Sequence, residues 1–107
     1  MFKVQFYQDE KGKEPFNEWL YSLSTKTKDR IVDRLYRIQS GNLGDYKRIR
    51  AGLFELRLFF YGGLRIYFGR DGDKIIVLLC GGDKKTQKRD IDKTQEYWSK
   101  YHEQNKD

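Results

Sequence analysis

Cysteine, histidine and proline are almost missing from this chain, with one of each among its 107 residues. The lone cysteine, Cys80, cannot form an internal disulfide, and one cysteine with one histidine cannot supply the four ligands of a structural zinc site. Cys80 lies inside an apolar run, which indicates a buried, unreactive thiol. We therefore expect a fold stabilised by its hydrophobic core, and no cofactor.

Long apolar segments are missing as well. The N-terminal residues 1–15 lack the apolar core of a secretory signal, and no apolar run is long enough to cross a bilayer. We expect a cytoplasmic protein without a membrane partner. No repeat, low-complexity tract or linker divides the chain, so its length fits a single domain over residues 1–107.

Positive charge and aromatic side chains are abundant. The formal net charge is +6, the sequence pI is about 9.4, and aromatic residues make up 16% of the chain. A basic surface favours an anionic partner, and nucleic acid is the leading candidate. The simpler interpretation, that the charge only keeps the protein in solution, is equally compatible with composition alone.

The spacing of apolar residues predicts an α+β domain, because alternation indicates strands and a spacing of three to four indicates helices. We expect a strand, two helices, a three-stranded antiparallel meander and a C-terminal helix starting at Thr86. The ranges before that helix are 2–7, 15–23, 25–40, 53–60, 64–70 and 74–80, with turns at YGG (61–63) and DGD (71–73). Residues 41–52 are predicted to form a loop or short turn. This element order favours helices packed together on one face of the sheet, with the N-terminal strand added to the meander.

Alternation within the meander assigns side chains to faces. Residues 54, 56, 58 and 60 form an apolar face, as do residues 64, 66 and 68 on the next strand. The opposite face then carries Arg57, Arg65 and Tyr67, which we expect to be exposed and close together.

A cationic segment follows the most apolar strand. Gly81 and Gly82 end that strand, and Lys84 and Lys85 come just before a predicted helix start, where free N–H groups suit phosphate. The residues expected to extend this cationic patch lie in the predicted loop before the meander: Lys47, Arg48 and Arg50. Together these side chains predict an anion-binding surface.

Each of these residues also has a simpler interpretation. Arg57 could pair with Glu55 or with an acid across the sheet, and Tyr67 is a common strand former. Lys84 and Lys85 could be solvated residues, although cations at a helix N-terminus are locally unfavourable, which favours a functional role. The arginines of the predicted helix 25–40 are interpreted as a solvated face.

Several phrases of the sequence resemble a known family. ELR (55–57), LRIYFGRDGDKIIVLLCGGDKKTQ (64–87), RDI (89–91) and the helical PFNEWL resemble the phage-type addiction-module killer proteins of the RelE/HigB toxin superfamily. The likeness covers nearly the whole chain. It implies a RelE/ParE-like sheet flanked by helices and a cognate antitoxin, usually a small helix-turn-helix DNA-binding protein. The two would form a hetero-oligomer.

The resemblance also implies an activity, the metal-independent cleavage of mRNA in the ribosomal A site. On this interpretation Arg57 and Arg65 clamp the phosphate, since guanidinium groups match phosphate oxygens in pairs. Lys84 is the first candidate for proton transfer, followed by Lys85 and Tyr67. Two alternatives stay open: a ParE-like gyrase poison that acts by binding, and a basic RNA- or ribosome-binding module without catalysis.

Overall fold

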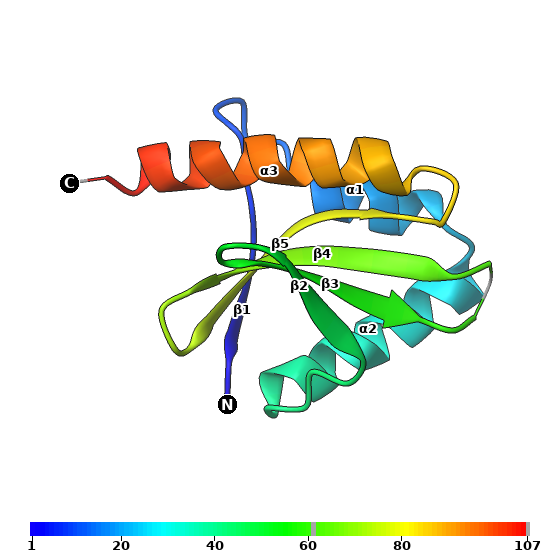
Figure 1. Cartoon of the computed structure of the whole chain (residues 1–107). Helices are drawn as coiled ribbons and strands as arrows, with labels where there is room; N and C mark the ends of the chain where they lie inside the picture. Colours follow the sequence, from blue (N-terminus) through cyan, green and yellow to red (C-terminus); the bar gives the residue numbers. More distant parts are fainter. Residues whose placement is uncertain (61, 107) are drawn as a thin grey trace.

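The computed structural model describes residues 1–60 and 62–106, and the predicted turn at residues 61–63 begins outside them, at Tyr61. The fold is α+β, and the predicted class and the order of the predicted elements are confirmed (Figure 1). The helices are α1 (Pro15–Ser22), α2 (Thr25–Gln39) and α3 (Gln87–Gln104). The strands are β1 (Lys3–Phe6), β2 (Tyr46–Arg50), β3 (Leu53–Leu58), β4 (Leu64–Asp71) and β5 (Ile75–Gly82). None of the helices formed by the described residues is long and apolar enough to cross a membrane.

The strands form one mixed sheet in the order β1-β5-β4-β3-β2. β1 pairs with β5 in parallel, and the other pairs are antiparallel, as the meander requires. β5 therefore lies inside the sheet, with a neighbour on each side. This position explains its continuous apolar sequence, because both of its faces are covered.

One predicted loop is a strand instead. Residues 46–50 form β2 at the edge of the sheet, where they pair with β3. The sequence YKRIR hides this strand, because three of its residues are basic and it lacks clear alternation. Its edge position tolerates exposed cations, and the ring of Tyr46 packs on Phe54 with centroids 5.9 Å apart. Residues 46–50 thus form a strand because of their tertiary contacts, although their sequence pattern does not indicate one.

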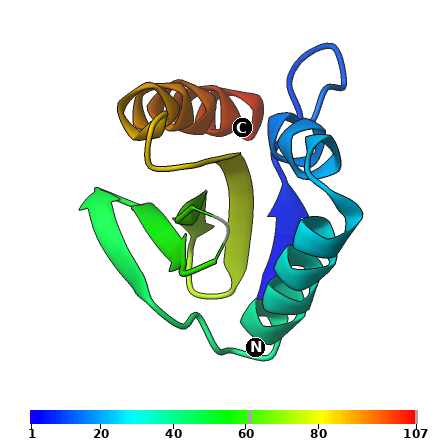
Figure 2. The ribbon, with the colours of Figure 1, turned by 90° about the vertical axis from the view of Figure 1, so that its right-hand side faces the viewer.

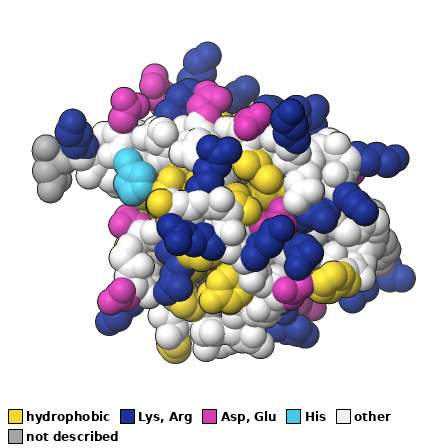
Figure 3. Space-filling view, viewed as in Figure 1, with side chains coloured by type: hydrophobic (Ala, Val, Ile, Leu, Met, Phe, Trp, Pro, Cys, Tyr) yellow, Lys and Arg dark blue, Asp and Glu magenta, His cyan; other side chains and the backbone are white. Residues whose placement is uncertain are grey.

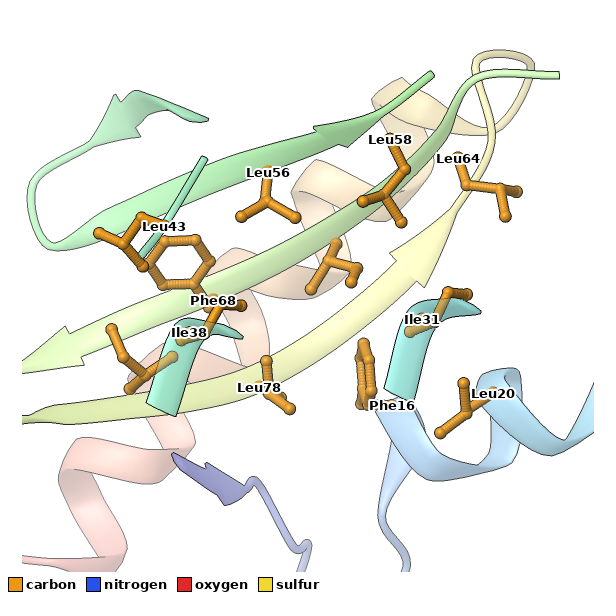
Figure 4. Close-up of a cluster of buried hydrophobic side chains, with 12 residues drawn as sticks. Phe16, Leu20, Ile31, Ile38, Leu43, Leu56, Leu58, Leu64, Phe68 and Leu78 are labelled. Atoms are coloured by element: carbon orange, nitrogen blue, oxygen red, sulfur yellow. The ribbon is translucent and has the colours of Figure 1, made fainter. Parts of the chain in front are cut away.

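The expectation that all helices cover one face of the sheet is wrong. Helices α1 and α2 pack on one face, and α3 packs on the other, with strands between them (Figure 2). The first core contains Phe16, Leu20, Ile31, Ile38, Leu43, Leu56, Leu58, Leu64, Ile66, Phe68, Ile76 and Leu78 (Figure 4). The second contains Tyr7, Leu53, Val77, Leu79, Trp98 and Tyr101. The physical reason is the doubly apolar β5, which exposes a second hydrophobic surface unless a helix covers it.

Glycines in the sheet let the helices approach closely. A Cβ atom on Gly81 would lie 2.1 Å from the ring of Trp19 in α1, and one on Gly69 would lie 2.3 Å from the ring of Trp98 in α3. Because these positions lack a side chain, each helix can pack its tryptophan directly against the strand backbone. Trp98 is buried in the core on its side of the sheet, and Trp19 packs, partly buried, against the other core.

Candidate functional site

Two arginines face each other on neighbouring strands. Arg57 of β3 is the cross-strand partner of Arg65 of β4, and Arg65 is in turn the partner of Gly82 of β5. The predicted sharing of one sheet face is confirmed by this register, since direct partners point to the same side. Like charges directly opposite destabilise a sheet, so this pair needs compensating anions.

Each arginine has one carboxylate nearby. The Nε atom of Arg57 lies 3.7 Å from Oδ2 of Asp45, and the Nε atom of Arg65 lies 3.7 Å from Oε2 of Glu55. Both separations are ion-pair distances and too long for hydrogen bonds. Arg65 also donates from Nη1 to the carbonyl oxygen of Gly63 at 2.9 Å. Arg65 is therefore positioned by a hydrogen bond and an ion pair, and Arg57 by an ion pair alone, while the Nε donors of both have no hydrogen-bond partner among the described residues.

Glu55 lies at the centre of this charge cluster. Its side chain is fully buried, and a buried carboxylate requires paired charges or hydrogen bonds. Lys47 lies 3.9 Å from Oε1, Arg65 pairs with Oε2, and Gln87 of α3 donates a 2.8 Å hydrogen bond to Oε2. Sequence reasoning considered Glu55 only as a partner of Arg57 and missed Gln87. The sequence did hold a signal for the pairing of Glu55: it lies on the same sheet face as Arg57 and Arg65, and a sheet brings such residues together.

Unsatisfied polar atoms gather at this place. Six buried side-chain N or O atoms of the described residues have no hydrogen-bond partner. Four of them belong here: Oε1 of Glu55, Nε of Arg57, Nε of Arg65 and the hydroxyl of Tyr67. Buried polar groups in folded proteins are nearly always satisfied, so this concentration marks the cluster as a candidate functional site.

The three side chains predicted to be exposed on this face differ in their actual exposure. Arg57 is 41% exposed, but the side chain of Arg65 is only 12% exposed and Tyr67 is fully buried. The expectation that all three are exposed is wrong for Arg65 and Tyr67, because α3 covers that part of the sheet. Burial, reinforced by the nearby carboxylates of Glu55 and Asp90, raises the pKa of Tyr67 well above its usual range. Its hydroxyl therefore stays protonated at neutral pH.

The glycines after β5 bring the start of α3 close to the sheet. A Cβ atom on Gly82 would lie 1.8 Å from Oδ2 of Asp90, the buried acid that accepts a short hydrogen bond from the Thr86 hydroxyl. The small size of Gly82 thus lets the start of α3 pack closely against β5. Because Gly82 is the partner of Arg65, the first turn of α3 lies beside the arginine pair.

Lys84 and Lys85 occupy the turn that leads into α3, and both are exposed. Asp83 shapes this turn, because its Oδ1 atom accepts the backbone N–H groups of Lys85 at 2.9 Å and Thr86 at 3.1 Å. Within residues 1–60 and 62–106, the ammonium groups of both lysines make no hydrogen bond or ion pair. They follow Gly82, the last residue of the Arg57–Arg65–Gly82 row, by two and three residues along the chain.

The basic residues of β2 divide between the two faces. Lys47 joins the cluster through Glu55, as described above. Arg48 is the partner of Phe54, which packs in the first core, so Arg48 projects from the opposite face and does not extend the patch as expected. Arg50 lies beyond a register shift and is exposed. Figure 3 shows Lys and Arg side chains gathered over the strands below α3.

Cys80 behaves as the sequence predicts. The residue is a free, buried thiol, and burial raises its pKa to about 11. The thiol is therefore protonated at neutral pH, and a protonated, buried thiol is a poor nucleophile.

The fold and the cluster define a small basic α+β domain in which two arginines on adjacent strands lie beside two carboxylates. Comparison with known proteins identifies the family. The sequence profile described as "Phage derived protein Gp49-like (DUF891)" matches residues 18–97, and the chain belongs to this family. The matched region contains every residue of the site. A Haemophilus influenzae protein recorded as "Uncharacterized protein" is 43% identical over 77 residues, which cover 71% of this chain and 78% of that relative.

Proposed function

We propose that this protein is the toxin of a type II toxin–antitoxin module and that it cleaves mRNA on the ribosome as a metal-independent endoribonuclease. Three observations support the proposal. The Gp49-like family is associated with the toxins of toxin–antitoxin modules, the chain carries a net charge of +6, and two arginines face each other on the sheet. The RelE/HigB resemblance of the sequence agrees with the same function.

The arginine pair is the observation that carries the proposal. Arg57 and Arg65 are direct cross-strand partners, and both keep an Nε donor without a hydrogen bond. A phosphate group between them would accept hydrogen bonds from both guanidinium groups and relieve their repulsion. A poison that only binds a protein surface has no need of two arginines paired for phosphate.

Cleavage of RNA at this site would follow an internal transfer. The 2′-oxygen of the substrate attacks the adjacent phosphorus as its proton is removed, and the bond to the 5′-oxygen breaks when that oxygen receives a proton. The products are a 2′,3′-cyclic phosphate and a 5′-hydroxyl. Arg57 and Arg65 stabilise the extra negative charge on the phosphoryl oxygens in the transition state.

We assign the proton transfers to the lysines at the end of the arginine row. Lys84 is the first choice and Lys85 the second, because both are exposed beside the first turn of α3. Tyr67 is fully buried on the same sheet face as the arginines, and it is the cross-strand partner of Glu55. We therefore propose that Tyr67 helps to position the cluster through a neutral, buried hydroxyl and does not transfer a proton.

The decisive experiment is primer extension on an mRNA in a purified translation system. The wild-type protein should produce discrete cuts on translated mRNA, and Arg57→Ala should reduce the cleavage rate by about 100-fold or more. Arg48→Ala is the matched control, because it removes the same charge from an exposed site on the opposite face of the sheet. That variant should cleave like the wild type.

Induction in cells and binding assays separate the alternatives. Intact mRNA together with gyrase-dependent DNA breaks after induction in cells would move the protein to the gyrase-poison class. Ribosome or RNA binding without any cut would leave a non-catalytic binding module. Equal cleavage by Arg57→Ala and the wild type would remove the proposed site, even if the protein were a nuclease.

A further inference from the structure

A hollow rich in arginine lies between α2 and the end of β3, and Arg57 of the arginine pair lines it. It has a volume of about 240 Å³. The charged residues that line it are Arg30, Asp33, Arg34, Arg37, Asp45 and Arg57. Three of the arginines come from one stripe of α2, at a spacing that places them on the same side of a helix. The interpretation of this stripe as a merely solvated face is therefore incomplete.

The charges in this hollow do not balance. Four arginines face two aspartates, so the lining carries an excess of positive charge. Nε of Arg34 and Nε of Arg57 are both buried without a hydrogen-bond partner. Arg34 is oriented by a weak hydrogen bond from Nη2 to the carbonyl oxygen of Leu43, at 3.4 Å. An anion in the hollow would offset this excess of positive charge and accept hydrogen bonds from the guanidinium groups that line it.

Aromatic rings complete the lining. Phe59 is 79% exposed, which is unusual for a large apolar side chain, and it lies in the wall of the hollow. The guanidinium group of Arg30 stacks 4.1 Å from the ring centre of Phe60 in the same wall. Arginines next to an exposed aromatic ring match the needs of single-stranded RNA, whose phosphates bind cations and whose bases stack on rings.

Arg57 belongs to both places, because it lines the hollow and faces Arg65 in the sheet. An RNA strand bound at the arginine pair could thus continue directly into the hollow. We propose that the hollow is an RNA subsite that binds a phosphate next to the cleaved one, through Arg34 and Arg37, and stacks a base on Phe59. This inference rests on the proposed function and extends its substrate from one phosphate to a length of single-stranded RNA.

The subsite can be tested without cleavage. The probe is a fluorescein-labelled single-stranded oligoribonucleotide with 2′-O-methyl groups throughout, which lacks the attacking hydroxyl. Fluorescence anisotropy at several salt concentrations gives its affinity for the wild type, Arg37→Ala and Phe59→Ala. Both side chains are exposed, so their removal spares the core, and thermal melts check the fold. The charge control is Lys11→Ala, in an exposed loop away from the hollow.

We expect Arg37→Ala and Phe59→Ala each to weaken binding by about tenfold. Arg37→Ala should also reduce the salt slope of log affinity by about 0.7, since one phosphate contact on a single strand is lost. Phe59→Ala should leave that slope unchanged, because stacking releases no counterion. Lys11→Ala should bind like the wild type.

Wild-type affinity and salt slope in both folded variants would overturn the subsite. Unchanged RNA binding together with weaker binding of a poly-glutamate peptide would also overturn it, and would assign the hollow to an acidic protein segment. Because the probe cannot be cut, the result is independent of the primer-extension experiment. Loss of RNA affinity in a protein that proves to have no nuclease activity would support the subsite while the proposed function fails.

Discussion

Glu55 and Arg65 form an almost fully buried ion pair between neighbouring strands, with Oε2 of Glu55 at 3.7 Å from Nε of Arg65. Removing the cation would leave a buried carboxylate with only Lys47 and Gln87 as partners. The sequence alone suggested that Arg65→Ala would spare the fold, because the residue was expected to be exposed. The structure reverses that expectation.

We predict that Arg65→Ala lowers the free energy of unfolding by about 2–4 kcal/mol, since a buried charge loses a partner. Arg65→Lys should lose less, because it keeps the charge. Urea unfolding measures both. Adding Glu55→Gln to Arg65→Ala should recover part of the loss; a double variant that is as unstable as the sum of its parts would contradict the pairing.

Arg57→Ala should behave differently. Its ion pair with Asp45 is exposed on both sides, at 41% and 45%, so its removal should cost no more than about 1 kcal/mol of stability. Cleavage should nevertheless fall by about 100-fold or more, because one transition-state contact is lost. Parallel melts and primer extension on Arg57→Ala measure the two effects. A large loss of stability would show that the arginine is structural.

Gly82 and Lys84 should separate packing from chemistry. Gly82→Val places a side chain where Asp90 and Thr86 already lie, so it should displace the start of α3 and impair both folding and cleavage. Lys84→Ala alters an exposed turn, and its stability should stay within about 0.5 kcal/mol of the wild type. Its cleavage rate should fall by about 100-fold if it transfers a proton. Full cleavage by Lys84→Ala would show that this lysine is only a surface residue.

Alkaline pH should weaken the fold through Tyr67. Its pKa is raised in the folded state above the ordinary value of 10.0, mainly by burial, so the folded protein holds this proton more tightly than the unfolded chain does. The stabilising contribution is complete below about pH 10 and is lost as the pH rises towards the higher folded-state pKa. Urea unfolding from about pH 8 to about pH 11 should show this decline.

Tyr67→Phe is the control for the pH effect. It should reduce the alkaline loss and leave stability at neutral pH unchanged or higher, because the buried hydroxyl has no hydrogen-bond partner among the described residues. Some decline should persist, starting near pH 9, since burial raises the pKa of Cys80 from 9.0 to about 11. An identical pH dependence in Tyr67→Phe and the wild type would contradict the assignment.

Much of the fold could be predicted because its signals are local. The alternation of β1, β3 and β4 and the helical stripes of α1 and α2 depend on neighbours within a few residues. β2 was missed because its strand structure depends on pairing with β3 at the sheet edge. The placement of α3 was not predicted, because the apolar sequence of β5 indicates that both faces are covered but not which helix covers each face.

The candidate site shows the same division. The sequence by itself determined that Arg57, Arg65 and Tyr67 share a face, since side chains alternate along any strand. Only the tertiary structure decided that Arg65 and Tyr67 are buried, that Arg65 rather than Arg57 pairs with Glu55, and that the α2 arginines meet Arg57 in a hollow. The physical reason is range: alternation acts between adjacent residues, whereas burial and charge pairing depend on segments that only folding brings together.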